Sequence, residues 1–368
     1  MIAITKRFLL LSPLMMLAGK AFGRQQAQFE TPPVIDEAAF RAVTAKTIDG
    51  YILPAYGTLK AKTAALAAAV SASCANPAAV PSTEVRAAFE AVLDAWAGVD
   101  FFRFGPIADE GRHERFCFLP DPHGTGVRQL RKILAEPDPA LLEPGAVAKL
   151  SAAVQGLPAL ESLLWSGESA TESLDYRCRL AARIAENLDA IAAATLDGWT
   201  RKGGWKETML SPGGDNIVYR DVTEPVVEIL KAIGVGVLQI RDQRLLPALG
   251  KSFDVAKPGR GVFVKSGMTL PYLRASGTAI GDLVTASTVL SLTPKEEAQL
   301  LDQTKAILAT YEANLAVGDD WTKALTTQAS YDKLRAAFDV LKKLEDIYNY
   351  TFPVAAGISP GFNALDGD

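Results

Sequence analysis

Glu161 is the residue of this sequence whose surroundings first suggest chemistry. It lies in the run Q-G-L-P-A-L-E-S-L-L-W, which covers residues 155–165 and is otherwise largely apolar. If Pro158 opens a helix, Leu164 and Trp165 are helical neighbours of Glu161. Two interpretations stay open: a carboxylate in the first turn, near the positive end of the helix dipole, or a carboxylate that faces a binding cleft. The second needs a nearby cation, because a buried unpaired charge is costly.

A second group of polar side chains lies in residues 101–124, which include both histidines of the chain, His113 and His123. A metal site formed by the two histidines and a carboxylate is one hypothesis. Their spacing fits no known metal motif, so a solvated loop is the favoured interpretation. Arg103 lies close to the turn at Gly105–Pro106, and we expect its guanidinium to be the ordered cation that pairs with Glu161.

Two further residues are candidates by position. Residues 270–274, L-P-Y-L-R, echo the L-P-A-L-E run that ends at Glu161, with arginine in place of the acid. We therefore expect Arg274 to contact Glu161. Glu345 lies beside an apolar stripe and is interpreted as a residue of a helix surface.

Several catalytic motifs are absent from the sequence. It contains no H-E-x-x-H, no G-x-S-x-G, no Walker loop and no dinucleotide-binding fingerprint. The only two histidines lie in one segment, which argues against a catalytic triad and is too few for a three-histidine zinc site.

Length and charge narrow the class of protein. The 368 residues suggest two domains. The net charge of −4 argues against nucleic acid as a partner, because phosphate binding needs a basic face. Residues 1–23 have a basic start, an apolar segment too short to span a membrane and small residues at the end, which is the pattern of a secretory signal peptide. Its removal takes away three positive charges, which leaves an acidic mature chain of about −7. No stable membrane span is expected after cleavage.

Three cysteines, Cys74, Cys117 and Cys178, allow three pairings with one thiol left over. An exported protein can carry a disulfide. Cys74 and Cys178 both lie on helical apolar stripes, so we favour this pair, which would link two helices. The alternative is that all three are small buried side chains.

Helical periodicity dominates the chain, and no convincing run of alternating strands is found. The predicted fold class is all-α, with two helical bundles. The predicted division is a signal peptide at 1–23, an N-terminal linker at 24–34, a first bundle at 35–200, a Gly- and Pro-rich linker at 201–221, a second bundle at 222–352 and a tail at 353–368.

An internal similarity supports two related halves. D-G-Y-I-L-P-A-Y-G at residues 49–57 matches D-Q-R-L-L-P-A-L-G at residues 242–250, and both place a proline inside a long predicted helix. Chance similarity between Ala- and Leu-rich helices is the alternative. The shared pattern favours an ancient duplication, which would give two bundles with a cleft between them. Such interfaces are common places for ligand sites.

Several short motifs resemble the imelysin family, in the order in which that family has them. They are R-F-G-P-I at 103–107, F-L-P-D at 118–121, G-L-P-A-L-E-S-L-L-W at 156–165 and the terminal G-F-N-A-L-D-G-D. The resemblance covers nearly the whole mature chain and is strongest to a branch of periplasmic lipoproteins. It implies two helical bundles related by duplication, a site between them, and kinship with metallopeptidases and with periplasmic components of iron uptake.

The family signature is G-x-H-x-x-E, and the resemblance carries over Gly156 and Glu161. Pro158 stands in place of the histidine and has no side-chain ligand atom. This departure argues against the usual metal binding and more strongly against peptidase activity, because a zinc peptidase needs about three protein ligands. The cysteine to which the branch attaches lipid is also missing, so a soluble periplasmic protein is expected.

These observations predict a non-catalytic periplasmic binding protein that serves the acquisition of iron or another divalent metal. Its site is expected near Glu161 in the cleft, with Arg103 and Arg274 as cationic partners and Asp121 as a second acid. Arginines would favour an anion or a metal chelate, whereas iron(III) alone would use carboxylate oxygens. One alternative is a metallopeptidase with Glu161 as base or ligand. Another is an interaction module that binds cell-envelope proteins and has no small-molecule site.

Overall fold

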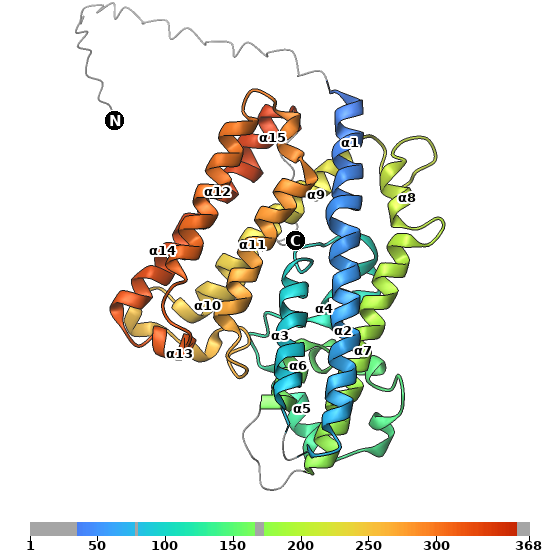
Figure 1. Cartoon of the computed structure of the whole chain (residues 1–368), viewed down its shortest axis with the longest axis vertical. Helices are drawn as coiled ribbons and strands as arrows, with labels where there is room; N and C mark the ends of the chain where they lie inside the picture. Colours follow the sequence, from blue (N-terminus) through green and yellow to red (C-terminus); the bar gives the residue numbers. More distant parts are fainter. Residues whose placement is uncertain (1–34, 78–79, 166–172, 359–368) are drawn as a thin grey trace, which may run out of the picture. The chain divides into compact units, whose positions relative to one another are not determined.

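The computed structural model describes residues 35–77, 80–165 and 173–358, and these residues form helices and no strand (Figure 1). The predicted all-α class is confirmed. The α-helices are α1 Glu37–Thr47, α2 Leu53–Ser73, α3 Thr83–Ala97, α4 Arg112–Phe116, α5 Thr125–Ala135, α6 Leu157–Trp165, α7 Leu174–Thr200, α8 Trp205–Leu210, α9 Thr223–Leu238, α10 Leu246–Leu249, α11 Thr269–Ser287, α12 Glu297–Asn314, α13 Trp321–Ala324, α14 Gln328–Asp346 and α15 Phe352–Ala355.

Local sequence signals explain where several helices begin. Asp36 accepts a hydrogen bond from the backbone of Ala39 and caps α1, and Ser82 does the same for α3 through Val85. Ser173 caps the 27-residue helix α7 in this way. Each cap satisfies a backbone N–H that has no partner within its helix, and short polar side chains do this best.

The helices pack in two groups that share contacts. In the first group α2 packs on α3 and α7, and α6 packs on α7. In the second group α12 packs on α11 and α14, and α14 packs on α9. The groups meet where α3 contacts α11 and where α1 contacts α9 and α11. The chain from Val34 onward forms one compact unit, and buried apolar side chains run through both groups.

Three long helices contain a proline and continue through it. A π-helical turn precedes Pro54 (residues 48–52), another precedes Pro247 (residues 239–245), and a third precedes Pro353 (residues 347–351). In each case the residue before the proline donates its N–H to the carbonyl five residues earlier. The wider turn accommodates the ring and the missing N–H of proline, which would otherwise break the helix.

The two copies of the repeated sequence at 49–57 and 242–250 thus share one local conformation. The proline alone explains that similarity, so the duplication stays a prediction, as do the domain boundaries. The predicted linker at 201–221 is not wholly irregular, since it contains α8. The predicted signal peptide, N-terminal linker and most of the tail lie outside the described residues. None of the described helices combines the length and the apolar character needed to cross a membrane.

Candidate functional site

Glu161 lies in the second turn of α6, because the helix begins at Leu157. The interpretation as a first-turn residue is therefore wrong. Its side chain is buried, with 6% of the residue exposed. The carboxylate Oε1 accepts hydrogen bonds from the backbone N–H of Ser266 at 2.9 Å and from the Ser266 hydroxyl at 2.7 Å. Burial raises the pKa of Glu161, and the two bonds from Ser266 and the charge of Lys265 offset part of that rise.

Glu161 and Asp121 line the same cavity, which has a volume of about 200 Å³. Asp121 also caps α5, because its two carboxylate oxygens accept the backbone N–H groups of Thr125 and Gly126 at 2.8 Å each. Gly259 and residues 261–265, which precede α11 of the second group, complete the lining. Lys265 reaches across and donates to the hydroxyl of Ser162 at 2.9 Å.

Gly156 has a packing role that its position in the signature does not reveal. A Cβ atom at Gly156 would lie 2.4 Å from the carbonyl oxygen of Phe116. No real side chain tolerates such a distance, so only glycine lets the start of α6 approach the end of α4. A direct role in ligand binding stays a prediction.

Arg103 has partners other than Glu161. Its Nη1 donates to the carbonyl oxygens of Asp100 and of Phe102 (3.1 Å for the latter) and lies beside the imidazole of His113. Within the described residues no hydrogen bond or ion pair joins Arg103 to Glu161. The guanidinium of Arg103 is instead held by its own loop and by His113.

The two histidines of this segment have different environments. His113 is buried and His123 is exposed. Burial, together with the charge of Arg103, lowers the pKa of His113 to about 3, so the imidazole is neutral near neutral pH. The interpretation of this segment as a solvated loop is therefore wrong for His113.

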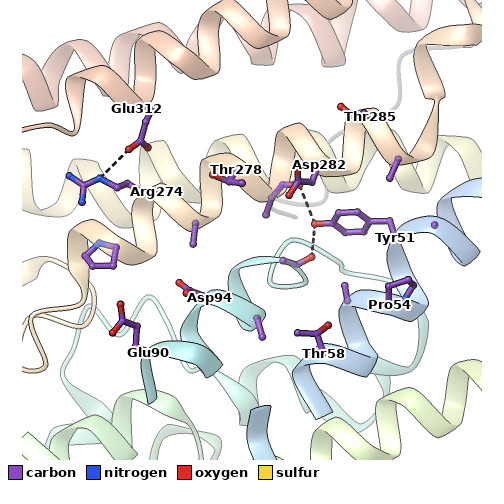
Figure 2. A pocket seen from close by; sticks show the side chains of 18 residues that line it. Tyr51, Pro54, Thr58, Glu90, Asp94, Arg274, Thr278, Asp282, Thr285 and Glu312 are labelled. Carbon is purple, nitrogen blue, oxygen red and sulfur yellow. Dashed lines mark hydrogen bonds and ion pairs between the residues drawn. The ribbon is translucent and has the colours of Figure 1, made fainter. Parts of the chain in front are cut away.

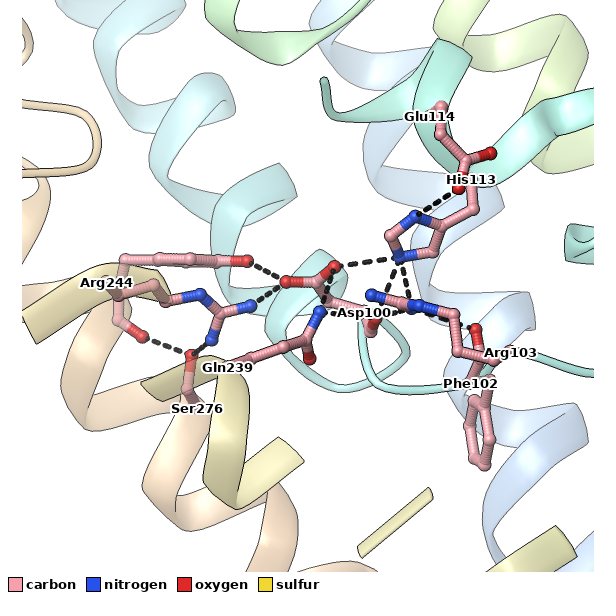
Figure 3. A network of polar contacts seen from close by, with 9 residues as sticks. Asp100, Phe102, Arg103, His113, Glu114, Gln239, Arg244 and Ser276 are labelled. Carbon is pink, nitrogen blue, oxygen red and sulfur yellow. Dashed lines mark hydrogen bonds and ion pairs between the residues drawn. The ribbon is translucent and has the colours of Figure 1, made fainter. Parts of the chain in front are cut away.

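Asp100 is the centre of a buried polar network that joins the two helix groups (Figure 3). It follows α3, and its Oδ2 accepts from the hydroxyl of Tyr272 at 2.7 Å and from the guanidinium of Arg244, with which it forms an ion pair. Nε2 of His113 lies 3.0 Å from Oδ1, and Gln239 donates to the Asp100 carbonyl at 3.3 Å. Every charged side chain in this network is largely removed from water, so each depends on its partners.

Arg274 also differs from the expectation. It lies 3.2 Å from a carboxylate oxygen of Glu312 and donates to the carbonyl of Leu315 at 2.9 Å. In the part of the chain that the structure describes, no hydrogen bond or ion pair joins Arg274 to Glu161. It lines a second, larger groove of about 1060 Å³ between α3 and α11, which Figure 2 shows. Glu345, interpreted as a surface residue, forms an ion pair with Arg241 and is only partly exposed.

The predicted disulfide is confirmed. Cys74 at the end of α2 is bonded to Cys178 in α7, with the two Cα atoms 5.6 Å apart. Cys117 remains a free, buried thiol. The helical stripes revealed this pair because each stripe faces the neighbouring helix.

Metal ligands are sparse in the part of the chain that the structure describes. No group of three or more His, Cys, Asp or Glu side chains there is arranged to hold a metal ion. The cavity at Glu161 can therefore offer carboxylate oxygens and an ammonium group to a ligand, but not a closed metal cage.

Sequence reasoning missed Asp100, Arg244, Gln239 and Tyr272. One signal was available: the apolar stripe of residues 226, 229, 233, 237 and 240 reaches residue 244 at the next step of four. Arg244 thus occupies a core position, and a buried arginine requires an acid. The sequence does not say which acid supplies that partner.

These observations define an all-helical protein whose two packed groups of helices meet near Glu161. The family model for imelysin, peptidase family M75, matches residues 52–348, and the chain belongs to this family. A comparison with curated proteins gives no match.

Two solved structures have a similar fold. An imelysin-like protein from Psychrobacter arcticum has a TM-score of 0.72 at 16% identity, covering 90% of this chain and 100% of that one. A protein from Parabacteroides distasonis, described as an iron-regulated protein A precursor, has a TM-score of 0.62 at 16% identity, covering 86% and 96%. At this identity the likeness establishes the fold alone.

Proposed function

We propose that this chain is an exported, periplasmic imelysin-like protein that binds a small metal-containing ligand without catalysis and serves the acquisition of iron or another metal. One observation carries the proposal. Glu161 and Asp121, the two acids that the sequence marks as candidates, line a single cavity of about 200 Å³ together with Lys265. The cavity lies where α5 and α6 meet Gly259 and residues 261–265.

The chemistry of the cavity favours a metal chelate over a bare ion. Carboxylate oxygens suit hard cations such as iron(III). The Asp121 oxygens and Oε1 of Glu161 already accept backbone or hydroxyl hydrogens, so they keep only part of their capacity to bind a ligand. Lys265 adds a positive charge to the lining of the cavity. A ligand that brings its own donor atoms and has charge of both signs fits this lining better than an ion that needs a full protein shell.

Three facts support the remaining parts of the proposal. Pro158 replaces the motif histidine, which removes a ligand that a peptidase of this family would use. The Cys74–Cys178 disulfide suits an oxidising compartment such as the periplasm. One structural neighbour is described as iron-regulated, which agrees with a role in metal acquisition.

Calorimetric titration tests the proposal. The mature chain, residues 24–368, is titrated with ferric citrate and separately with zinc chloride, and the same is done for Glu161→Gln. We expect ferric citrate to bind the wild type and Glu161→Gln to lose about tenfold in affinity, the effect of one charge-assisted contact. Glu136→Gln is the matched control, because Glu136 is exposed and lies outside the cavity.

The possible results separate the alternatives. If neither ferric citrate nor zinc chloride binds the wild type, the proposal of metal binding is wrong. If Glu136→Gln weakens binding as much as Glu161→Gln, binding depends on the overall charge of the protein and the cavity is not the site. Peptide cleavage that a chelator abolishes would instead make the chain a metallopeptidase.

A further inference from the structure

The groove between α3 and α11 is distinct from the cavity at Glu161, and the two share no lining residue. Small side chains form much of its lining, among them Ala55, Ala95, Ala275 and Ala279. The hydroxyl of Tyr51 lies 2.9 Å from the carbonyl of Gly98 and 3.1 Å from that of Ala279 and so links the two walls. The result is an open groove of about 1060 Å³ with a largely apolar floor.

Negative charge is concentrated on both sides of this groove (Figure 2). Glu90 and Asp94 come from α3, Asp282 from α11 and Glu312 from α12. Arg274 is the one cation in the lining, and Glu312 neutralises it at 3.2 Å. Among the described residues, no side chain forms an ion pair with Glu90, Asp94 or Asp282, so three carboxylates face the groove uncompensated.

The helix ends add to this negative potential. Asp94 lies in the last turn of α3, and neither α3 nor α11 has a basic residue in its last turn. Residues of both last turns, including Ala95 and Ala286, line the groove. A carboxylate near a helix C-terminus is repelled by the partial negative charge of the helix dipole. A bound cation would offset that repulsion. Partial burial raises the pKa of Asp94 and of Asp282, and the charge of Glu90 raises that of Asp94 further.

We propose that this groove binds a linear aliphatic oligoamine, with its ammonium groups on Glu90, Asp94 and Asp282 and its methylene chain on the alanine floor. Glu90 and Asp94 are four residues apart on one helix face, a separation of about 6 Å. Ammonium groups joined by three or four methylenes have roughly the same spacing, given bonds of about 1.5 Å. The methylenes gain from burial against apolar surface.

Other cationic ligands fit the groove less well. A hydrated metal ion would need carboxylates that converge, and the described residues contain no such cluster of three. An extended peptide would leave its backbone groups unpaired, because the walls are helices whose own backbone groups are already bonded. An oligoamine requires neither converging carboxylates nor partners for backbone groups. The inference does not depend on the proposed function of the cavity at Glu161.

Titration of the mature chain with spermidine at low ionic strength tests this inference. We expect saturable binding at one site that weakens as salt rises. Asp94→Asn and Asp282→Asn should each lower the affinity about tenfold. Asp302→Asn removes the same charge from an exposed position of α12 outside the groove and should change the affinity less than about twofold. Ala275→Leu fills the floor without a change of charge and should abolish binding.

Three results would overturn the inference: no saturable binding of spermidine, equal effects of Asp302→Asn and Asp282→Asn, or magnesium chloride that competes at the same concentration as spermidine. The last would mean a general cation surface. Circular dichroism of each variant establishes that a loss of binding does not reflect a loss of fold. A failed ferric citrate titration leaves this test unaffected, because the two sites share no residue.

Discussion

Replacement of Asp100 by asparagine should destabilise the protein more than its small change in shape suggests. Asp100 is 5% exposed, and its ion-pair partner Arg244 is 7% exposed. Asparagine keeps the volume and can still accept from Tyr272, but it removes the negative charge. The guanidinium of Arg244 then stays buried without a counter-charge, and only neutral acceptors remain for it: the asparagine amide oxygen and the Ser276 hydroxyl at 2.9 Å.

The expected loss follows from the cost of a buried charge without its partner. Breaking a buried ion pair by removal of one member costs about 3–5 kcal/mol. Natural domains have a total stability of about 5–15 kcal/mol, so Asp100→Asn should remove a large share of it. The double variant Asp100→Asn/Arg244→Met removes both charges, and its cost should fall below the sum of the two single costs by about 2 kcal/mol or more.

Urea unfolding followed by far-UV circular dichroism measures these free energies, and tryptophan fluorescence tests whether both helix groups unfold together. The network joins the groups, so Asp100→Asn should also separate the two transitions. A loss below about 1 kcal/mol for Asp100→Asn, or costs that simply add in the double variant, would refute the reasoning. Asp254→Asn, at an exposed position, is the matched control.

Two other predictions concern stability. The Cys74–Cys178 bond closes a loop of 104 residues, so its replacement by two alanines should lower the free energy of unfolding by about 3–5 kcal/mol; a urea midpoint equal to that of the wild type would contradict this. Burial raises the folded-state pKa of Glu161 above its ordinary value of 4.5. The stability that the protonated Glu161 contributes to the fold is therefore fully present below pH 4.5 and is lost as the pH rises through the raised pKa. Urea midpoints of the wild type should therefore decline relative to Glu161→Gln over that pH window, and a constant difference would count against burial of the charge.

Much of the fold could be predicted because it depends on local order. Ser82 caps α3 by accepting from the backbone N–H of Val85, and such a cap involves residues only three positions apart. Cys74 and Cys178 were paired correctly because each lies on a stripe that identifies the buried face of its helix. Pro54 was expected inside a long helix, and a π-helical turn lets the helix continue through it.

The candidate site could be predicted only in part. Glu161 and Asp121 were identified as acids that share a site, and they line one cavity. The partners of Glu161 were predicted incorrectly: Arg103 is held within its own loop and Arg274 by Glu312, whereas Ser266 supplies the hydrogen bonds. Nothing in the serine or its neighbours distinguishes it from many other serines of the chain.

The sequence alone determined the helical class, the family, the faces that each helix buries and the loss of the motif histidine at Pro158. These features follow from the periodicity and chemistry of residues that are close along the chain. Only the tertiary structure decided that Asp100 pairs with Arg244, 144 residues away, and with Tyr272, 172 residues away. Helical periodicity specifies which side of a helix is buried, but the packing of whole helices selects the partner that it meets there.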